Sequence, residues 1–577
     1  MKRRLLIPAG VLLVCGAVFA VAALEGVLKP LPKLPSLLPE GALLSIEARD
    51  FGSLLHDWNS SAEKRAWLSS DNHAVFSNSR LFTRLSQAQD EFSAAASLPA
   101  DSSLLENVAG KESCLGLYDI GNLEFVYVTR LDQQRIENSP LWRTRSKFEQ
   151  RSEAGTPFFV HTDTKSSRTA AFAVKDGWLI LGTREDLVAG VLDRLAGKAS
   201  HSLDNEGWFT EAVQQAAGER GDLRMVLNLD KIVRTPYFRS YWVQQNITEM
   251  KQYASAVSDL YRGSQSYREE RVLVRRSAVA AASRADVRAL AALAPANAAF
   301  YAAQSSPSPE VVLAALRGDL IEPMQQRESA SNTTAPSAAI SENAGSAVQL
   351  DERIDQAPVA VEQADAYAPL RALLATQPPD ASLQVYSTRL SQQNVFVSLQ
   401  TAIVLSAPRN WDENAARQAL TSALPPSLTA GKLGVNWKKQ SSASGDYLAL
   451  DGAVPFYLAI NGKQLLLSND SVLLESLLAR RLQTASSDQK GAVTYAALFQ
   501  HTQEQNSFRR LMAQLDRAGN HSANDQQASS ESNPSPAFFS GNVNSLSRMF
   551  SNLKSEQIEE RDLGVKVAQT VTYQWAH

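Results

Sequence analysis

The chain has 577 residues and a formal net charge of −3 at pH 7. This charge gives no electrostatic reason to expect nucleic acid as a partner. The length exceeds what one hydrophobic core accommodates, so several domains are predicted. Hydrophobic residues make up 44% of the chain and charged residues 20%, a composition that is ordinary for a globular protein and argues against disorder throughout.

The N-terminus carries the most specific signal for location. Positions 2–4 are basic and precede Leu5–Leu24, twenty residues without a charge. In helical form such a segment just spans the hydrocarbon core of a membrane, and the basic flank predicts that the N-terminus stays in the cytoplasm. Residues 1–24 are therefore predicted to be a transmembrane anchor, or a signal peptide with its cleavage site at Ala20-Val21-Ala22.

The next segment, residues 25–36, is rich in proline and contains Lys29-Pro30-Leu31-Pro32-Lys33-Leu34-Pro35. Regularly spaced prolines favour a semi-extended stalk that holds a domain away from a membrane. The stalk favours the anchor over the cleaved signal. The expected location is the cell envelope, as a single-pass protein of the inner membrane, or the periplasm or exterior if the signal is removed.

One pattern occurs twice, at Phe172–Leu195 and at Leu458–Arg481, 286 positions later. Each copy predicts two short strands around a turn, followed by an amphipathic helix. The apolar positions are kept, whereas charged residues such as Asp176 and Arg184 become Gly462 and Asp470. A pattern that keeps its core but not its charges indicates a duplicated packing unit rather than a site.

The first lobe is predicted over residues 37–278. It opens with Pro39-Glu40-Gly41-Ala42 and a strand, Asp50 is the expected N-cap of the following helix, and a strand over 267–274 closes it. Strands joined by short turns, with helices inserted in blocks, predict a mainly antiparallel α+β fold.

The second lobe is predicted over residues 286–577. Pro295-Ala296-Asn297-Ala298 restates the opening motif at a displacement of 256, so about 30 extra residues must precede the second hairpin. The segments 324–349 and 519–536 are poor in apolar residues and are expected to be disordered insertions. Glu559-Glu560-Arg561 is interpreted as the counterpart of Glu269-Glu270-Arg271. The predicted fold class is α+β, with two related lobes after an N-terminal helix.

The predicted lobes differ most at residues 236–261, where Tyr237, Phe238, Tyr241 and Trp242 follow helical spacing. These four aromatic side chains either pack into the protein or form an exposed interaction patch for a partner, a polymer or a lipid interface. They are the candidate site residues of the sequence. A basic run from Arg262 to Arg276 is interpreted as a solvated, salt-bridged face.

The sequence contains no phosphate-binding loop, dinucleotide fingerprint, nucleophile elbow or zinc-protease motif. Pairs such as His56-Asp57, or His161 with Asp163, are too commonplace to indicate catalysis. Cys114 has no partner for a disulfide within the exported part, and a buried, inert thiol is expected. Accordingly, no cofactor, metal or catalytic residue is predicted, although a site assembled from distant positions would escape this search.

The anchor, the Pro-x-x-Ala strand and the hairpin that leads into a helix together resemble certain bacterial envelope proteins of unknown function. The resemblance rests on Pro39–Ala48 and Ala173–Leu195, with their repeats beginning at Pro295 and Ala459, and it implies no activity. Three hypotheses remain open: a binding or scaffold protein of the envelope, a carrier of a lipid or apolar ligand held in a groove between sheet and helices, and an envelope hydrolase with a dispersed site.

Overall fold

In the computed structural model of the chain, residues 32–575 are described apart from these segments: 71–72, 74–76, 99–102, 199–200, 217, 236–249, 280–284, 322–364, 391–396, 425–434, 453, 481–490 and 503–551. The described part is a mixture of helices and antiparallel strands, so the α+β class is confirmed. Contacts divide the chain into two compact units, Met1–Asn59 with Arg80–Val257 and Ser60–Ser79 with Ser258–His577.

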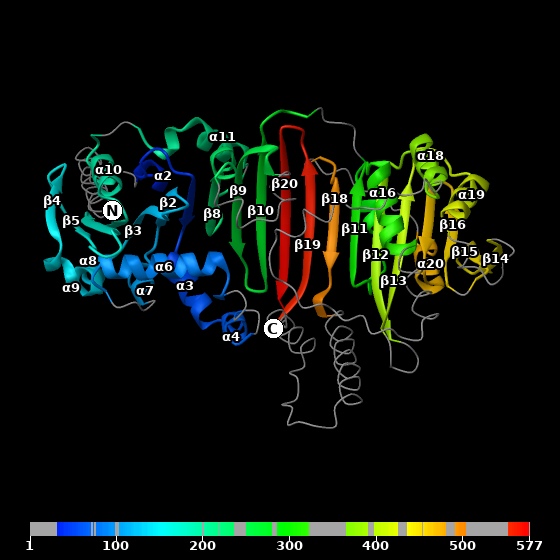
Figure 1. Ribbon diagram of the computed structural model, residues 1–577, viewed down its shortest axis with the longest axis horizontal. Helices are drawn as coiled ribbons and strands as arrows, with labels where there is room; N and C mark the ends of the chain where they lie inside the picture. The colour runs from blue at the N-terminus through cyan, green and yellow to red at the C-terminus, as the bar shows by residue number, and fades with distance from the viewer. Residues whose placement is uncertain are drawn as a thin grey trace, which may run out of the picture. The chain divides into compact units, whose positions relative to one another are not determined.

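Among the described residues of the first unit, eight strands pair with one another in antiparallel order (Figure 1). These strands are β1 (Leu44–Ala48), β2 (Ser113–Asp119), β3 (Glu124–Arg130), β4 (Glu149–Glu153), β5 (Thr156–Thr162), β6 (Thr169–Lys175), β7 (Trp178–Gly182) and β8 (Leu223–Asn228). The pairings give the spatial order β8-β1-β2-β3-β7-β6-β5-β4. The first strand of the chain therefore lies inside the sheet, between β8 and β2.

Helices cover both faces of this sheet. They are α2 (Leu34–Leu37), α3 (Phe51–Ser60), α6 (Arg80–Ala95), α7 (Ser103–Val108), α8 (Gln133–Asn138), α9 (Pro140–Thr144), η2 (Arg145–Lys147), α10 (Glu185–Leu195), η3 (Leu203–Asn205), α11 (Gly207–Gln215) and α12 (Leu229–Ile232). On one face, α2, α10 and α11 pack against Val126 and Ile180; on the other, α6, α8 and α9 pack against Phe172 and Leu181. Each face has its own hydrophobic core.

The second unit contains the strands β10 (Ser266–Arg275), β11 (Phe300–Ser305), β12 (Ala381–Leu390), β13 (Val397–Ser406), β14 (Trp437–Ser442), β15 (Gly445–Leu450), β16 (Tyr457–Asn461), β17 (Gln464–Ser468), β18 (Tyr495–Phe499), β19 (Leu553–Asp562) and β20 (Lys566–Trp575). The division between the units falls within β9 (Tyr253–Arg262). Pairing gives the order β10-β20-β19-β18-β11-β12-β13-β17-β16-β15-β14. In Figure 1, β10 (green) stands beside β20 (red).

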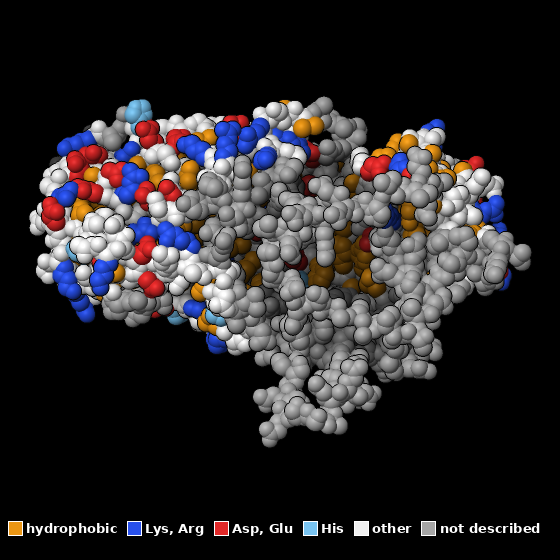
Figure 2. All heavy atoms as spheres, in the orientation of Figure 1, with side chains coloured by type: hydrophobic (Ala, Val, Ile, Leu, Met, Phe, Trp, Pro, Cys, Tyr) orange, Lys and Arg blue, Asp and Glu red, His pale blue; other side chains and the backbone are white. Residues whose placement is uncertain are grey.

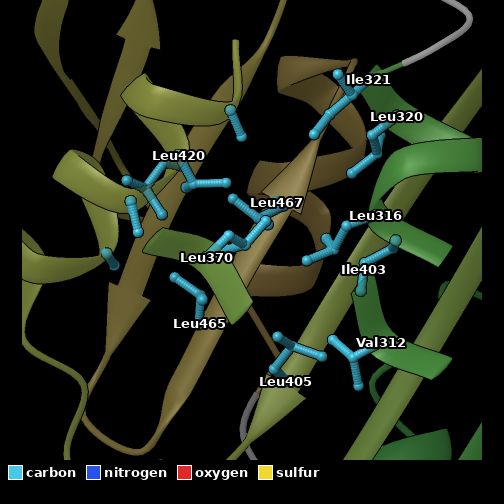
Figure 3. Packing of buried hydrophobic residues seen from close by; sticks show 14 of the residues in the cluster. Val312, Leu316, Leu320, Ile321, Leu370, Ile403, Leu405, Leu420, Leu465 and Leu467 are labelled. Atoms are coloured by element: carbon cyan, nitrogen blue, oxygen red, sulfur yellow. The ribbon is translucent and has the colours of Figure 1, made fainter. Parts of the chain in front are cut away.

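The helices of the second unit are α4 (Ala62–Leu68), α15 (Arg288–Ala291), α16 (Pro309–Ala315), the π-helix η4 (Leu316–Ile321), α18 (Ala368–Thr376), α19 (Glu413–Ala423) and α20 (Ser471–Leu478). On one face, α15 and α20 pack against Leu383 and Val404. On the other, Leu316 of η4 faces Ile403 and Leu467, with α18 and α19 completing the core (Figure 3).

Eight strands of each unit follow the same order, with β18, β11, β12, β13, β17, β16, β15 and β14 in place of β8, β1, β2, β3, β7, β6, β5 and β4. The registers agree as well. From Leu181, successive partners are Tyr127, Leu115 and Ile46. From Leu467, 286 positions later, they are Ile403, Gln384 and Ala302. Ile46 and Ala302 are 256 positions apart, which is the displacement of the two Pro-x-x-Ala motifs.

Several local predictions are confirmed. The hairpin forms as β6 and β7, the turn places Asp176 and Gly177 at positive φ, and α10 follows. Asp50 accepts a hydrogen bond from the Ser53 amide at 2.9 Å, as an N-cap does. The Cys114 thiol is fully buried, and burial raises its pKa well above the ordinary value.

Other predictions are wrong. The stalk does not extend over its last predicted residues, since Leu34 and Pro35 lie in α2 and are buried. Glu269 and Glu559 are not counterparts: they lie in β10 and β19, which flank β20 from opposite sides.

The boundary between the units differs from the prediction. The strand expected to close the first lobe at 278 is β10, and β10 belongs to the second unit because nine of its residues pair with β20. The predicted segments 1–24 and 519–536, and residues 324–349, lie outside the described residues, as do Tyr237, Phe238, Tyr241 and Trp242. Within the described ranges, no helix is long and apolar enough to cross a membrane.

Candidate apolar ligand site

The first unit contains an apolar pocket of about 620 Å³ between its sheet and helices α3, α6 and α7. This volume is ordinary for a small-molecule site. The sheet contributes Ile46, Ala48, Ser113, Leu115, Leu117, Phe125, Tyr127, Leu181 and Leu223, and Thr183 follows the end of β7. The helices and loops contribute Phe51, Leu85, Ala88, Gln89, Phe92, Ser93, Leu104, Leu105, Val108, Leu123 and Arg168.

Strand alternation builds the floor of the pocket. Successive side chains of a strand point to opposite faces, so Cys114 and Val126 enter the core beneath α10, whereas Leu115 and Phe125 face the pocket. The core-facing pair is fully buried, but Leu115 and Phe125 are only partly buried. The helices therefore leave part of an apolar sheet face uncovered.

The helical wall places large apolar side chains at the edge of the pocket. Phe92 of α6 is buried and packs against Phe125, with ring centroids 5.7 Å apart. Leu85 of α6 and Leu105 of α7 also line the pocket and are 46% and 47% exposed. An apolar ligand that covered these leucines would remove their surface from water, which favours binding.

The polar groups of the floor bond to the protein itself. Tyr127 Oη lies 3.0 Å from Ser113 Oγ and 3.1 Å from the Val108 carbonyl oxygen, and Ser113 Oγ lies 2.7 Å from Thr129 Oγ1. Burial raises the pKa of Tyr127 and outweighs these hydrogen bonds, which lower it. Satisfied polar groups do not call for a polar ligand group, so the floor suits hydrocarbon.

Charge lies at the end of the pocket formed by Leu123 and Arg168. The Arg168 guanidinium donates to Glu91 Oε2 at 3.0 Å and to the Asn122 carbonyl oxygen at 2.6 Å. Arg84 Nη1 lies 3.6 Å from Glu91 Oε1. Elsewhere on the face of the first unit seen in Figure 2, acidic and basic side chains are interspersed.

The described residues do not assemble catalytic chemistry at the pocket. No cluster of metal-ligating side chains occurs among them. His56 lies exposed on α3; His161 Nδ1 bonds the Ala95 carbonyl oxygen at 2.6 Å; and Asp163 accepts from Ser166, which lowers the pKa of Asp163. Cys114 faces the other core.

In the second unit, the strand positions equivalent to those of the pocket floor carry different side chains. Gln384 takes the place of Leu115, and Thr401 that of Phe125. Tyr386, which takes the place of Leu117, donates to Asp319 Oδ2 of η4 at 2.8 Å. The same strand order therefore carries polar side chains where the first unit carries apolar ones.

Sequence reasoning did not identify this site. The aromatic patch at Tyr237–Trp242 lies outside the described residues. The detectable signal was the loss of apolar character at Leu115 and Phe125 between the two halves. This difference can be recognised only from the strand pairings, which show which positions of the two halves are equivalent.

No protein-family model and no curated protein matches the chain. Among solved structures, the chain is similar to crystal forms I, III and IV of TP0453, with TM-scores of 0.26, 0.23 and 0.22 and sequence identities of 7%, 8% and 9%. Each match covers 43% of this chain and 80%, 81% and 83% of the other chain, respectively. Likeness at this level supports no statement about function.

Proposed function

We propose that this protein is an exported, membrane-anchored protein of the bacterial cell envelope, built from two related α+β lobes, and that its first lobe binds an apolar ligand such as a lipid. Export rests on the basic N-terminus and the uncharged segment Leu5–Leu24. Binding rests on the apolar pocket.

The relation between the lobes is supported by two separate displacements. Sequence patterns give 256 for the opening motif and 286 for the hairpin. The strand pairings connect Leu181 to Ile46 through three successive partners. The same pairings in the second unit connect Leu467 to Ala302, and Ile46 and Ala302 are also 256 positions apart. Unrelated sheets have no reason to reproduce both values together with the same strand order.

The contrast between the units is the observation that carries the binding proposal. The second unit has the same strand order but carries Gln384 and Thr401 at the positions of Leu115 and Phe125. Stability of the fold therefore does not require apolar residues at these two positions. Apolar side chains that remain partly exposed at Leu115 and Phe125 have an energetic cost of about 25 cal/mol for each Å² left in water. A bound apolar ligand would offset that cost.

The proposal is tested by giving the first unit the residues of the second. The double variant Leu115→Gln, Phe125→Thr of the full chain should bind the uncharged dye Nile red at least about tenfold more weakly, since two apolar contacts are lost. Fluorescence titration of delipidated protein measures the affinity, and circular dichroism checks the fold.

Leu399→Gln is the matched control, because it makes the same kind of change at a 49% exposed leucine of β13. Its affinity for the dye should equal that of the unchanged protein. If the delipidated protein takes up no dye, or if the double variant binds it normally, the binding proposal is wrong.

A protein scaffold remains the second candidate, and it depends on the aromatic stretch Tyr237–Trp242, which lies outside the described residues. No observation on the described residues favours a hydrolase over a binding protein, since the pocket's Ser113 and Tyr127 are engaged with other protein groups.

A further inference from the structure

We infer, building on the proposed binding of an apolar ligand, that the pocket takes a single-headed anionic amphiphile of the fatty-acid class. The hydrocarbon chain would lie on the floor formed by Leu115 and Phe125, and the carboxylate would lie beside Arg168. The inference rests on the charges at that end of the pocket.

Arg168 reaches the pocket from the loop between β5 and β6. Its side chain is 9% exposed, and it bonds Glu91 and the Asn122 carbonyl oxygen. Arg84 approaches from α6, and its Nε and Nη2 lie 3.2 and 3.0 Å from the Gly121 carbonyl oxygen. Both guanidinium groups are thus held by the turn between β2 and β3.

Glu91 is the carboxylate that both arginines share, at 3.6 Å from Arg84 and 3.0 Å from Arg168. Backbone carbonyl groups accept hydrogen bonds but carry no net charge, so this cluster of two cations and one anion has one positive charge in excess. The three side chains are only 27%, 19% and 9% exposed, in the order Arg84, Glu91, Arg168. An uncompensated charge is costly where water is partly excluded, and a bound anion lowers that cost.

One surplus positive charge matches one carboxylate. A phosphate monoester carries about −1.5 to −2 charges at neutral pH and would exceed it. A guanidinium group also offers the paired donors that a carboxylate accepts. On the floor, the pocket's Ser113 and Tyr127 already bond each other, so these two side chains are not left for a second polar head. These features select a ligand with a single acidic head and an apolar tail.

The ligand class is tested on the full, delipidated chain with hexadecanoate and hexadecanol, which share a tail and differ in charge. Displacement of Nile red should show that the unchanged protein binds the acid about tenfold more tightly than the alcohol, the effect of one charge-assisted hydrogen bond. Arg168→Gln should remove this preference, and Arg84→Gln should reduce it. Glu91→Gln should increase it, because the competing carboxylate is gone.

Arg151→Gln is the control, since Arg151 pairs with Glu149 and Glu185 on β4 and α10 and does not line the pocket. Melting curves establish that each variant is folded; if Arg168→Gln does not fold, Arg84→Gln and Glu91→Gln still move the preference in opposite directions. Equal affinity for acid and alcohol, or a preference that none of the three variants changes, overturns the carboxylate assignment and leaves the apolar pocket standing. If neither ligand nor the dye binds, the proposed function itself is wrong.

Discussion

Leu115 and Gln384 occupy equivalent positions in the matching strand pairings of the two units. Leu115 faces an apolar pocket, whereas Gln384 brings an amide to its sheet. Phe125 and Thr401 repeat the contrast. The opposite pattern holds in the hairpins, where Leu179 and Leu181 are matched by Leu465 and Leu467. At the residue scale, the two halves keep the apolar positions of the hairpin, including Leu181 at the pocket, and they differ at Leu115 and Phe125 of the pocket floor.

Gly110 provides a prediction at this scale. A Cβ atom there would clash with the Arg130 carbonyl oxygen, so Gly110→Ala must displace backbone at the end of β3. We expect it to destabilise the first unit by about 1–3 kcal/mol, measured by urea denaturation of the full chain with tryptophan fluorescence. Gly207→Ala is the control, because nothing lies within 4 Å of its Cβ position and alanine favours the helix. Equal stability of the two variants would contradict the expected clash.

At the scale of elements, amphipathic segments were predicted well and edge strands poorly. The helix after each hairpin is apparent from its apolar spacing, and in α20 Asp470 accepts from the Leu473 amide at 2.8 Å as its N-cap. By contrast β4, with the sequence EQRSE, is almost wholly exposed and has no apolar alternation. It is a strand because it pairs with β5. Hydrophilic edges of this kind protect a sheet from further pairing, and they lack the pattern by which strands are recognised.

The strands β9 and β10 supply a pH prediction. Burial acts to raise the pKa of Glu269, but hydrogen bonds from Arg271 and Ser258 outweigh it, and the net effect lowers the pKa. A lowered pKa means that the stabilisation is present above the unfolded value of about 4.3 and is lost as the pH falls through the folded value. Glu269→Gln should therefore reduce stability at pH 7, by up to about 1 kcal/mol for a partly exposed pair.

The loss caused by Glu269→Gln should shrink as the pH falls below about 4, because the unchanged protein then also loses its carboxylate. Denaturant midpoints across this pH range measure it. Glu270→Gln breaks the more exposed ion pair with Arg268, at 3.5 Å, and serves as the comparison. It should reduce stability less at pH 7. A loss that is the same at every pH would show that the Glu269 charge makes no contribution.

At the scale of the whole molecule, length and composition predict several cores, and the residues that the structure describes form four hydrophobic clusters, two in each unit. The paired clusters follow from sheets that carry helices on both faces. The predicted location concerns Leu5–Leu24, and it calls for an experiment on the intact chain.

Separation of membrane and soluble fractions from bacteria that produce the full chain should place the protein in the membrane fraction, with Met1 or the residue after it at the N-terminus. Alkaline carbonate should fail to extract it, because twenty apolar residues remain in the bilayer. Release of a shortened protein with its N-terminus near Ala22 would indicate a cleaved signal instead. A full-length protein in the cytosol would refute export.

The elements whose signals are local could be predicted from the sequence: the hairpin and helix at Phe172–Leu195, the N-cap at Asp50, the buried thiol of Cys114 and the α+β class. Apolar periodicity, turn residues and capping residues act over a few positions, so the sequence alone is enough to identify the elements that they form. Three features could be seen only in the tertiary structure. They are the place of β10 in the second unit, the formation of the edge strand β4, and the pocket. Each depends on pairing between segments far apart in the chain, and only the registers of those pairs bring Leu115, Phe125 and Arg168 to one cavity.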